Sequence, residues 1–169
     1  MIKRYFYFLF FILIGFNSYA ETTVNFVDIK FLIDQSNSGK KINELLIDLR
    51  KKETSKLKKM QTNLKKQESE IKSKNNILSK EELEKNITKL KTNINDYNNL
   101  KNKKEIEFNK KKTEYMNKLL LEINKIMISY IDKNSIDIVI KKENLVTGKK
   151  ELDITKYILD ELNKKKINF

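Results

Sequence analysis

The sequence predicts an α+β fold that is mostly α-helical: a long antiparallel helical hairpin, which forms a coiled-coil arm, on a small β body with a C-terminal helix. Three observations support this class. The chain has no Gly or Pro between residues 40 and 133. Apolar residues recur there at steps of about seven, as they do in packed helices. The flanking segments are rich in β-branched residues, which favour strands.

The chain is expected to divide into four parts. Residues 1–20 form a signal peptide, residues 21–39 the first part of the β body, and residues 40–133 the helical arm, with a turn near residues 78–79. Residues 134–169 form a β-hairpin and a C-terminal helix that complete the body. A body of about fifty residues is marginal as an independent core. Because Cys and His are absent, no disulfide or zinc site can reinforce it, and we expect copies of the chain to associate.

The N-terminus has the three parts of a secretory signal. Basic Lys3 and Arg4 precede an apolar run from Tyr5 to Phe16, and Ala20 offers a small residue for cleavage. An uncleaved membrane anchor is the alternative, but a spanning helix needs roughly twenty apolar residues and this run is shorter. We therefore expect a bacterial periplasmic protein that is soluble after the signal peptide is removed.

The first part of the body combines a strand with a short helical turn. Val24–Ile29 is β-branched and aromatic, and we expect burial on both faces. Phe31–Ile33 continues as a helical turn. The polar stretch at residues 36–39 interrupts the chain before the arm, and Ser38 or a neighbour can cap the first long helix.

The register of the arm follows from its apolar spacing, because antiparallel helices of equal rise pair residues whose numbers have a constant sum. A reversal near Leu78 and Ser79 pairs Leu49 with Phe108, Leu57 with Leu100, Met60 with Tyr97, Leu64 with Ile94 and Ile71 with Ile87. Ser79 and Glu82 have the spacing of a capping box, which predicts the start of the returning helix.

The apolar period changes from helical to alternating after Asn134. Ile136–Ile140 predicts a strand, and Leu145–Thr147 a second strand that completes a β-hairpin. Asp153 or Thr155 can cap a final helix. We expect the tail from Lys164 to Phe169 to be frayed.

The positive charge is concentrated in the arm. Residues 40–133 hold 25 basic and 14 acidic side chains, whereas the body is neutral once the signal peptide is removed. The predicted fold point brings the runs 50–66 and 101–112 alongside each other. These two runs form a basic belt at the middle of the arm.

Catalytic chemistry has little support in this composition. Without His or Cys there is no imidazole base, thiol nucleophile or zinc site. The three glycines are too scattered for a phosphate loop, and Ser38-Gly39-Lys40-Lys41 has only its Gly-Lys pair. We interpret the carboxylates on the arm as parts of solvated helix faces, because general acid–base catalysis needs a pocket that excludes water. We expect no enzyme activity, no cofactor and no metal.

The two ends of the mature chain carry a family resemblance. Val24–Ile29 followed by Ser38-Gly39-Lys40, and Ile136–Ile140 followed by Asp153-Ile154-Thr155, resemble the opening and closing motifs of the Skp (OmpH-like) family of periplasmic chaperones. The resemblance implies a homotrimer with an intersubunit β-barrel. It also implies that the arms enclose unfolded outer-membrane proteins and prevent their aggregation without ATP.

This reading assigns candidate residues to two surfaces. The candidate client-binding residues are the basic ones of the belt: Arg50, Lys51, Lys52, Lys58, Lys59, Lys65, Lys66, Lys101, Lys103 and Lys104. The candidate residues of the oligomer body are apolar: Val24, Phe26, Val27, Ile29, Ile138, Ile140, Leu145 and Val146. Anionic lipid or lipopolysaccharide is a further partner of the family, but no motif places it on numbered positions.

Three other functional classes compete with this reading. A structural or adaptor coiled coil of the cell envelope would tether a folded partner. A solvated face would leave the basic belt without any ligand. Nucleic-acid binding would suit the charge, but export argues against it, and no aromatic residues are interleaved with the lysine runs as a stacking platform requires.

Overall fold

The computed structural model describes residues 22–169, so the predicted signal peptide at residues 1–20 lies outside the described residues. A short strand, β1 (Val24–Val27), leads through helix α2 (Ile29–Gln35) into the two long helices of the arm, α3 (Asn37–Lys74) and α4 (Lys80–Asn134). Strand β2 (Ile138–Lys141), the 3-10 turns η1 (Lys142–Asn144) and η2 (Lys150–Leu152), and helix α5 (Thr155–Asn163) follow. Within residues 22–169, no helix is both long enough and apolar enough to span a membrane.

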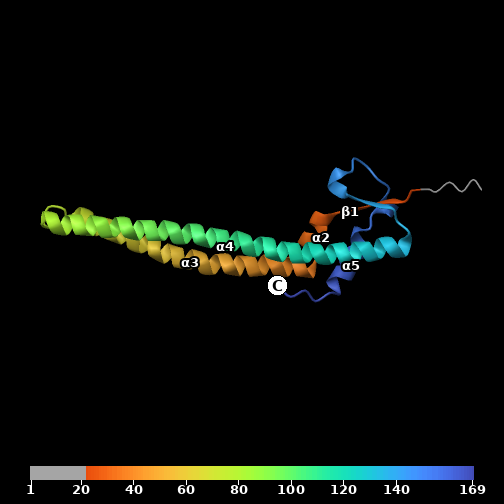
Figure 1. The fold of residues 1–169 in the computed structure, drawn as a ribbon, viewed down its shortest axis with the longest axis horizontal. Helices are drawn as coiled ribbons and strands as arrows, with labels where there is room; N and C mark the ends of the chain where they lie inside the picture. Colours follow the sequence, from red (N-terminus) through yellow and green to blue (C-terminus); the bar gives the residue numbers. More distant parts are fainter. Residues whose placement is uncertain (1–21) are drawn as a thin grey trace, which may run out of the picture.

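Helices α3 and α4 run antiparallel and form one narrow arm (Figure 1). The turn between them is the tip of the arm, and the small body lies at the other end. The chain reverses between Lys74 and Lys80. The predicted capping box is present: the Ser79 hydroxyl accepts from the Glu82 N–H, and the Glu82 carboxylate accepts from the Ser79 N–H at 3.2 Å. Both orphan donors of the first turn are thereby satisfied, which fixes the start of α4.

Contacts between the two limbs lie close to the predicted register at the middle of the arm and depart from it toward the tip. Gln67 accepts a hydrogen bond from the Asn93 side-chain amide at 2.8 Å. Closer to the body, Glu53 lies 3.3 Å from Lys104, and Arg50 lies 2.6 Å from Glu105. Nearer the tip the predicted pairs of Leu64 with Ile94 and of Ile71 with Ile87 are wrong, because Ile94 and Ile87 are exposed and Asn93 lies in the seam instead.

The β structure differs from the predicted hairpin. Strand β2 pairs with β1 in parallel, with Val24 opposite Ile138 and Val27 opposite Lys141. The predicted second strand at Leu145–Thr147 is absent, and the expectation of a β-hairpin at residues 134–147 is wrong. The 3-10 turn η1 bends the chain directly after β2, so that β2 finds its partner in the distant N-terminal strand instead of the next segment.

The segment after η1 covers β1 instead of pairing with β2. A Cβ on Gly148 would lie 2.7 Å from the Leu145 Cδ2 and 3.0 Å from the Phe26 ring, so Gly148 packs closely on both side chains. On the other side of β1, the Ile154 N–H donates to the Phe26 carbonyl at 3.0 Å. Strand β1 is thus held between β2 and the start of α5.

The hydrophobic core lies at the root of the arm. Its buried members come from β1, α2, α3, α4 and the α5 region: Val27, Leu32, Ile42, Leu119, Ile123, Ile126, Ile154, Ile158 and Leu162. The tail also packs here, contrary to the expected fraying. Ile167 and Phe169 pack against the core, and the Phe169 ring meets Tyr115 edge-on at 5.8 Å between centroids. Two apolar side chains in an otherwise polar tail account for this docking.

The junction between α2 and α3 is close-packed. Ser36, a neighbour of the predicted Ser38, caps α3 by accepting from the Gly39 N–H at 3.0 Å. A Cβ on Gly39 would lie 1.7 Å from the Ile33 carbonyl oxygen. Gly39 therefore serves this helix junction, which sets the direction in which the arm leaves the body.

Candidate functional site

Most of the candidate client-binding residues are exposed on the arm. Seven of them make no ion pair with any residue that the structure describes: Lys51, Lys52, Lys58, Lys59, Lys65, Lys101 and Lys103. Lys66 lies 3.9 Å from Glu70 on its own helix. The structure thus leaves eight basic side chains facing solvent on α3 and α4, where they can attract an acidic ligand.

Arg50 and Lys104 have a different role, because both bind carboxylates between the limbs. Arg50 donates to Glu105 through both terminal nitrogens, at 2.6 and 3.3 Å, and its guanidinium lies 3.8 Å from the centroid of the Phe108 ring. Hydrogen bonding to Glu105 raises the pKa of Arg50, and the same bonds from Arg50 lower the pKa of Glu105. Both residues are therefore charged at neutral pH.

Lys104 completes this cluster from α4. Its ammonium lies 3.3 Å from Glu53 on the other limb and 2.7 Å from Glu107 on its own, and its side chain is only 24% exposed. Hydrogen bonds to Glu107 and then Glu53 raise the pKa of Lys104. The predicted register already placed Glu53 opposite Lys104, so the sequence held a signal for this contact. We call Arg50, Glu53, Lys104 and Glu105 the limb clasp.

Apolar side chains are exposed among the lysines of the arm. The seam between the limbs leaves Leu57 and Leu100 half-buried, whereas Ile47 and Ile94 are exposed. Ile106, which follows the clasp residues of α4, is 69% exposed. The arm therefore presents scattered apolar side chains next to ammonium groups.

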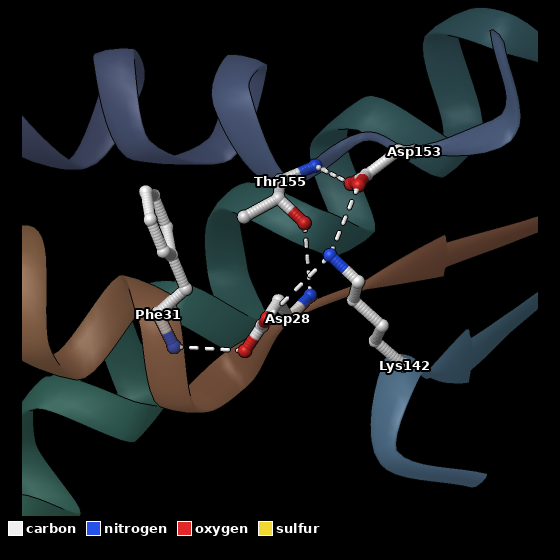
Figure 2. Close-up of polar contacts among 5 residues, drawn as sticks. All are labelled: Asp28, Phe31, Lys142, Asp153 and Thr155. Atoms are coloured by element: carbon white, nitrogen blue, oxygen red, sulfur yellow. Dashed lines mark hydrogen bonds and ion pairs between the residues drawn. The ribbon is translucent and has the colours of Figure 1, made fainter. Parts of the chain in front are cut away.

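The two motifs that carry the family resemblance meet in the body. Figure 2 shows Asp28, at the end of β1, beside Thr155, at the start of α5. The Asp28 N–H donates to the Thr155 hydroxyl at 2.8 Å. The Asp28 carboxylate caps α2 through the Phe31 N–H, while Asp153 accepts from the Thr155 N–H. The bond from Asp28 to Thr155 joins the two distant ends of the chain. The predicted cap of α5 by Asp153 or Thr155 is wrong, because the N-cap residue is Ile154 and it makes no side-chain cap bond.

Lys142 links the two carboxylates, and sequence reasoning did not find it. Its ammonium lies 3.7 Å from both Asp28 and Asp153 (Figure 2). Nothing local marks Lys142 among many lysines, because its partners are more than ten residues away and come together only in the fold. A hollow of about 570 Å³ opens beside this junction, between Phe31 and Leu159. The junction therefore holds the two ends of the fold together, and an apolar hollow lies beside it.

The candidate residues of the oligomer body fall into two groups. Phe26 and Val27 are buried within their own chain, whereas the other members are at least partly accessible: Val24, Ile29, Ile138, Ile140, Leu145 and Val146. Ile138 and Val146 are the most exposed of these. In the described residues, β2 pairs only with β1, so its outer edge has free backbone groups. These residues are the ones that another copy can reach.

A long two-helix arm on a small body that joins both chain ends defines the architectural class of this protein. The family model described as outer membrane protein (OmpH-like) matches residues 23–162, and the chain belongs to this family. No curated protein matches the chain.

A solved structure has the same fold. It is the crystal structure of a candidate outer membrane chaperone (OmpH-like) from Caulobacter crescentus CB15, with a TM-score of 0.79. The match has 16% sequence identity and covers 92% of this chain and 93% of that one. At this identity the likeness establishes the fold.

Proposed function

We propose that this protein is an ATP-independent holdase of the periplasm, which binds unfolded outer-membrane proteins and prevents their aggregation. Membership of the OmpH-like family supports a chaperone role, as does the likeness to a structure described as a candidate outer membrane chaperone. The observation that carries the proposal is the surface of the arm. Unpaired lysines lie on both long helices there, and exposed isoleucines accompany them at Ile47 on α3 and at Ile87, Ile94 and Ile106 on α4.

The chemistry of this surface suits an unfolded barrel protein. Such a chain exposes alternating apolar residues, is often acidic, and aggregates through unpaired strand edges. Single exposed residues such as Ile106 and Lys103 bind weakly, but many of them acting on one client raise retention through effective concentration. Each contact can still exchange, so the client is held without a fixed structure and released without catalysis or a cofactor.

Three copies of the chain would build the cavity. The small core, the free edge of β2, and the exposed Ile138 and Val146 support self-association through the body. In a homotrimer whose strands join into a barrel, three arms would surround the client. The same lysines can attract anionic lipid or lipopolysaccharide as a second class of partner, because their charge does not distinguish between acidic surfaces.

Charge reversal on the belt tests the proposal. The triple variant Lys58→Glu, Lys59→Glu, Lys103→Glu removes exposed charge and leaves Lys104, and with it the limb clasp, intact. A control with the same change in net charge places three reversals nearer the tip of the arm: Lys85→Glu, Lys89→Glu and Lys91→Glu. Binding of a urea-denatured acidic barrel protein is measured by fluorescence anisotropy over a salt series.

The belt variant is expected to bind the client at least several-fold more weakly than the control, with a smaller dependence on salt. Equal affinity for the parent, control and belt variant at all salt concentrations would contradict a role for the belt. In that case the lysines would be a solvated face.

A further inference from the structure

The last residues of the chain return to the arm instead of ending in solvent. After α5 the backbone runs beside the root of α3 and α4, where the C-terminus lies (Figure 1). The N–H groups of Lys164 and Lys165 still donate to carbonyls in α5. In the part of the chain that the structure describes, residues 166–169 make no hydrogen bond, and Ile167 and Phe169 are held by apolar packing.

The surface under the tail lies on α4. Tyr115 receives the edge of the Phe169 ring, and the Lys111 ammonium lies 5.7 Å from the centroid of the Tyr115 ring. A hollow of about 300 Å³ continues beside the tail, bordered on α4 by Lys118, Leu121 and Glu122. Leu121 is still 55% exposed. We call Tyr115, Lys118 and Leu121 the tail seat, which the tail covers only in part.

The charges favour exchange of the tail for another ligand. The tail is basic at Lys164, Lys165 and Lys166, and it lies next to Lys118, a cation of the seat. Lys164 pairs with Glu161 and Lys118 with Glu114, but Lys165 and Lys166 have no ion pair among the described residues. On α4 beside the tail, Lys111 and Lys118 pair with Glu114, and Lys125 pairs with Glu122, which leaves a net positive charge. An acidic segment in place of the basic tail would be attracted by this charge.

We propose that the tail seat is a binding surface for a short, acidic, aromatic-bearing apolar segment of an unfolded chain, and that the C-terminal tail occupies it as a displaceable strap. The family match ends at residue 162, so the tail lies beyond the matched region. The identity of the incoming segment as part of a client rests on the proposed function. The existence of the seat does not.

The docked tail should lower the apparent affinity of the tail seat for an incoming segment. A tail that is docked about nine-tenths of the time leaves about one molecule in ten competent to bind, which weakens binding about tenfold. Segments held by a few side chains and no backbone hydrogen bonds open easily, so the tail can exchange without unfolding the core.

A labelled peptide of residues 163–169 probes the seat directly, by fluorescence anisotropy. The protein is compared with two full-fold variants, one ending at Lys166 and one carrying Ile167→Ser with Phe169→Ser. Asn168→Ser is the control, since Asn168 is exposed. Both tail variants are expected to bind the peptide about tenfold more tightly than the parent and the control. A peptide with the same two Ser substitutions should not bind, which excludes attraction by charge alone.

Equal peptide affinity in the parent and both tail variants would overturn the proposal. A denatured acidic barrel protein should displace the peptide from the truncated chain, and failure to displace it would overturn the assignment of the seat to clients. If the chain binds the peptide but does not suppress aggregation of a barrel protein, the proposed holdase function is wrong, while the assignment of the tail seat as a binding surface remains. Circular dichroism checks that each variant is folded.

Discussion

The substitution Gly39→Ala tests how closely α2 and α3 must approach where the arm is rooted. Helix propensity alone predicts a gain, because Ala is more stable than Gly in a helix by at most about 1 kcal/mol. In the structure, however, the new Cβ would lie 1.7 Å from the Ile33 carbonyl oxygen and 2.8 Å from its carbon. An ordinary carbon–oxygen contact is about 3.3 Å.

The neighbour in this overlap is backbone, so a change of side-chain rotamer cannot relieve it. The two helices have to separate, which also strains the Ser36 cap on Gly39. Overpacking costs about 1–3 kcal/mol, and an overlap this severe belongs at the upper end. After the gain in propensity is subtracted, we expect the variant to lose about 2 kcal/mol of unfolding free energy.

Chemical unfolding followed by far-ultraviolet circular dichroism measures this loss, at a fixed protomer concentration because association can contribute to stability. Asn43→Ala is the matched control, since Asn43 is exposed on the same helix. It is expected to gain a few tenths of a kcal/mol. A Gly39→Ala variant as stable as the parent, or more stable, would refute the close approach of α2 and α3.

Three further substitutions test the core, the turn and the clasp. Leu119→Ala empties a fully buried site and should cost about 2–5 kcal/mol, whereas Leu121→Ala, on the exposed face of the same helix, should change unfolding free energy by about 0.5 kcal/mol or less. Ser79→Ala removes the α4 cap and should cost about 1 kcal/mol, seen as faster deuterium exchange in the first turn of α4, with Ser69→Ala as the neutral control. Hydrogen bonds from Arg50 lower the pKa of Glu105 below its ordinary value of 4.5. The pair of Arg50 with Glu105 therefore stabilises the contact between the limbs fully above pH 4.5, and this stabilisation is lost as the pH falls through the lowered pKa. Spin labels on the two limbs should show the mid-arm opening over that range, and Glu105→Gln should remove this step.

The long helices could be predicted because their signals are local and repeated. Seven-residue apolar steps indicate which residues of the limbs face each other at the middle of the arm, although not at Ile87 and Ile94, and the Ser79–Glu82 box marks the start of α4 within four residues of sequence. The same register predicts the contact between Glu53 and Lys104. Periodicity over many residues averages out the weak preference of any one side chain.

The errors concern contacts between distant parts of the chain. Leu145–Thr147 has strand-like residues, but its surroundings are set by Phe26 and Gly148, which no local pattern reveals. The docking of Phe169 on Tyr115 also depends on the path of the chain after α5. Net charge alone places Arg50 and Lys104 on a client surface, whereas in the fold both pair with carboxylates on the other limb.

Aggregation of an outer-membrane barrel protein, diluted from urea in the absence of nucleotide, tests the central claim most directly. With residues 21–169 of the chain present in molar excess, light scattering is expected to stay near the level of buffer alone and to rise again as salt weakens attraction by the belt. Scattering that follows the same course with and without the chain, while the chain itself remains folded, would contradict the account and favour a structural coiled coil of the envelope.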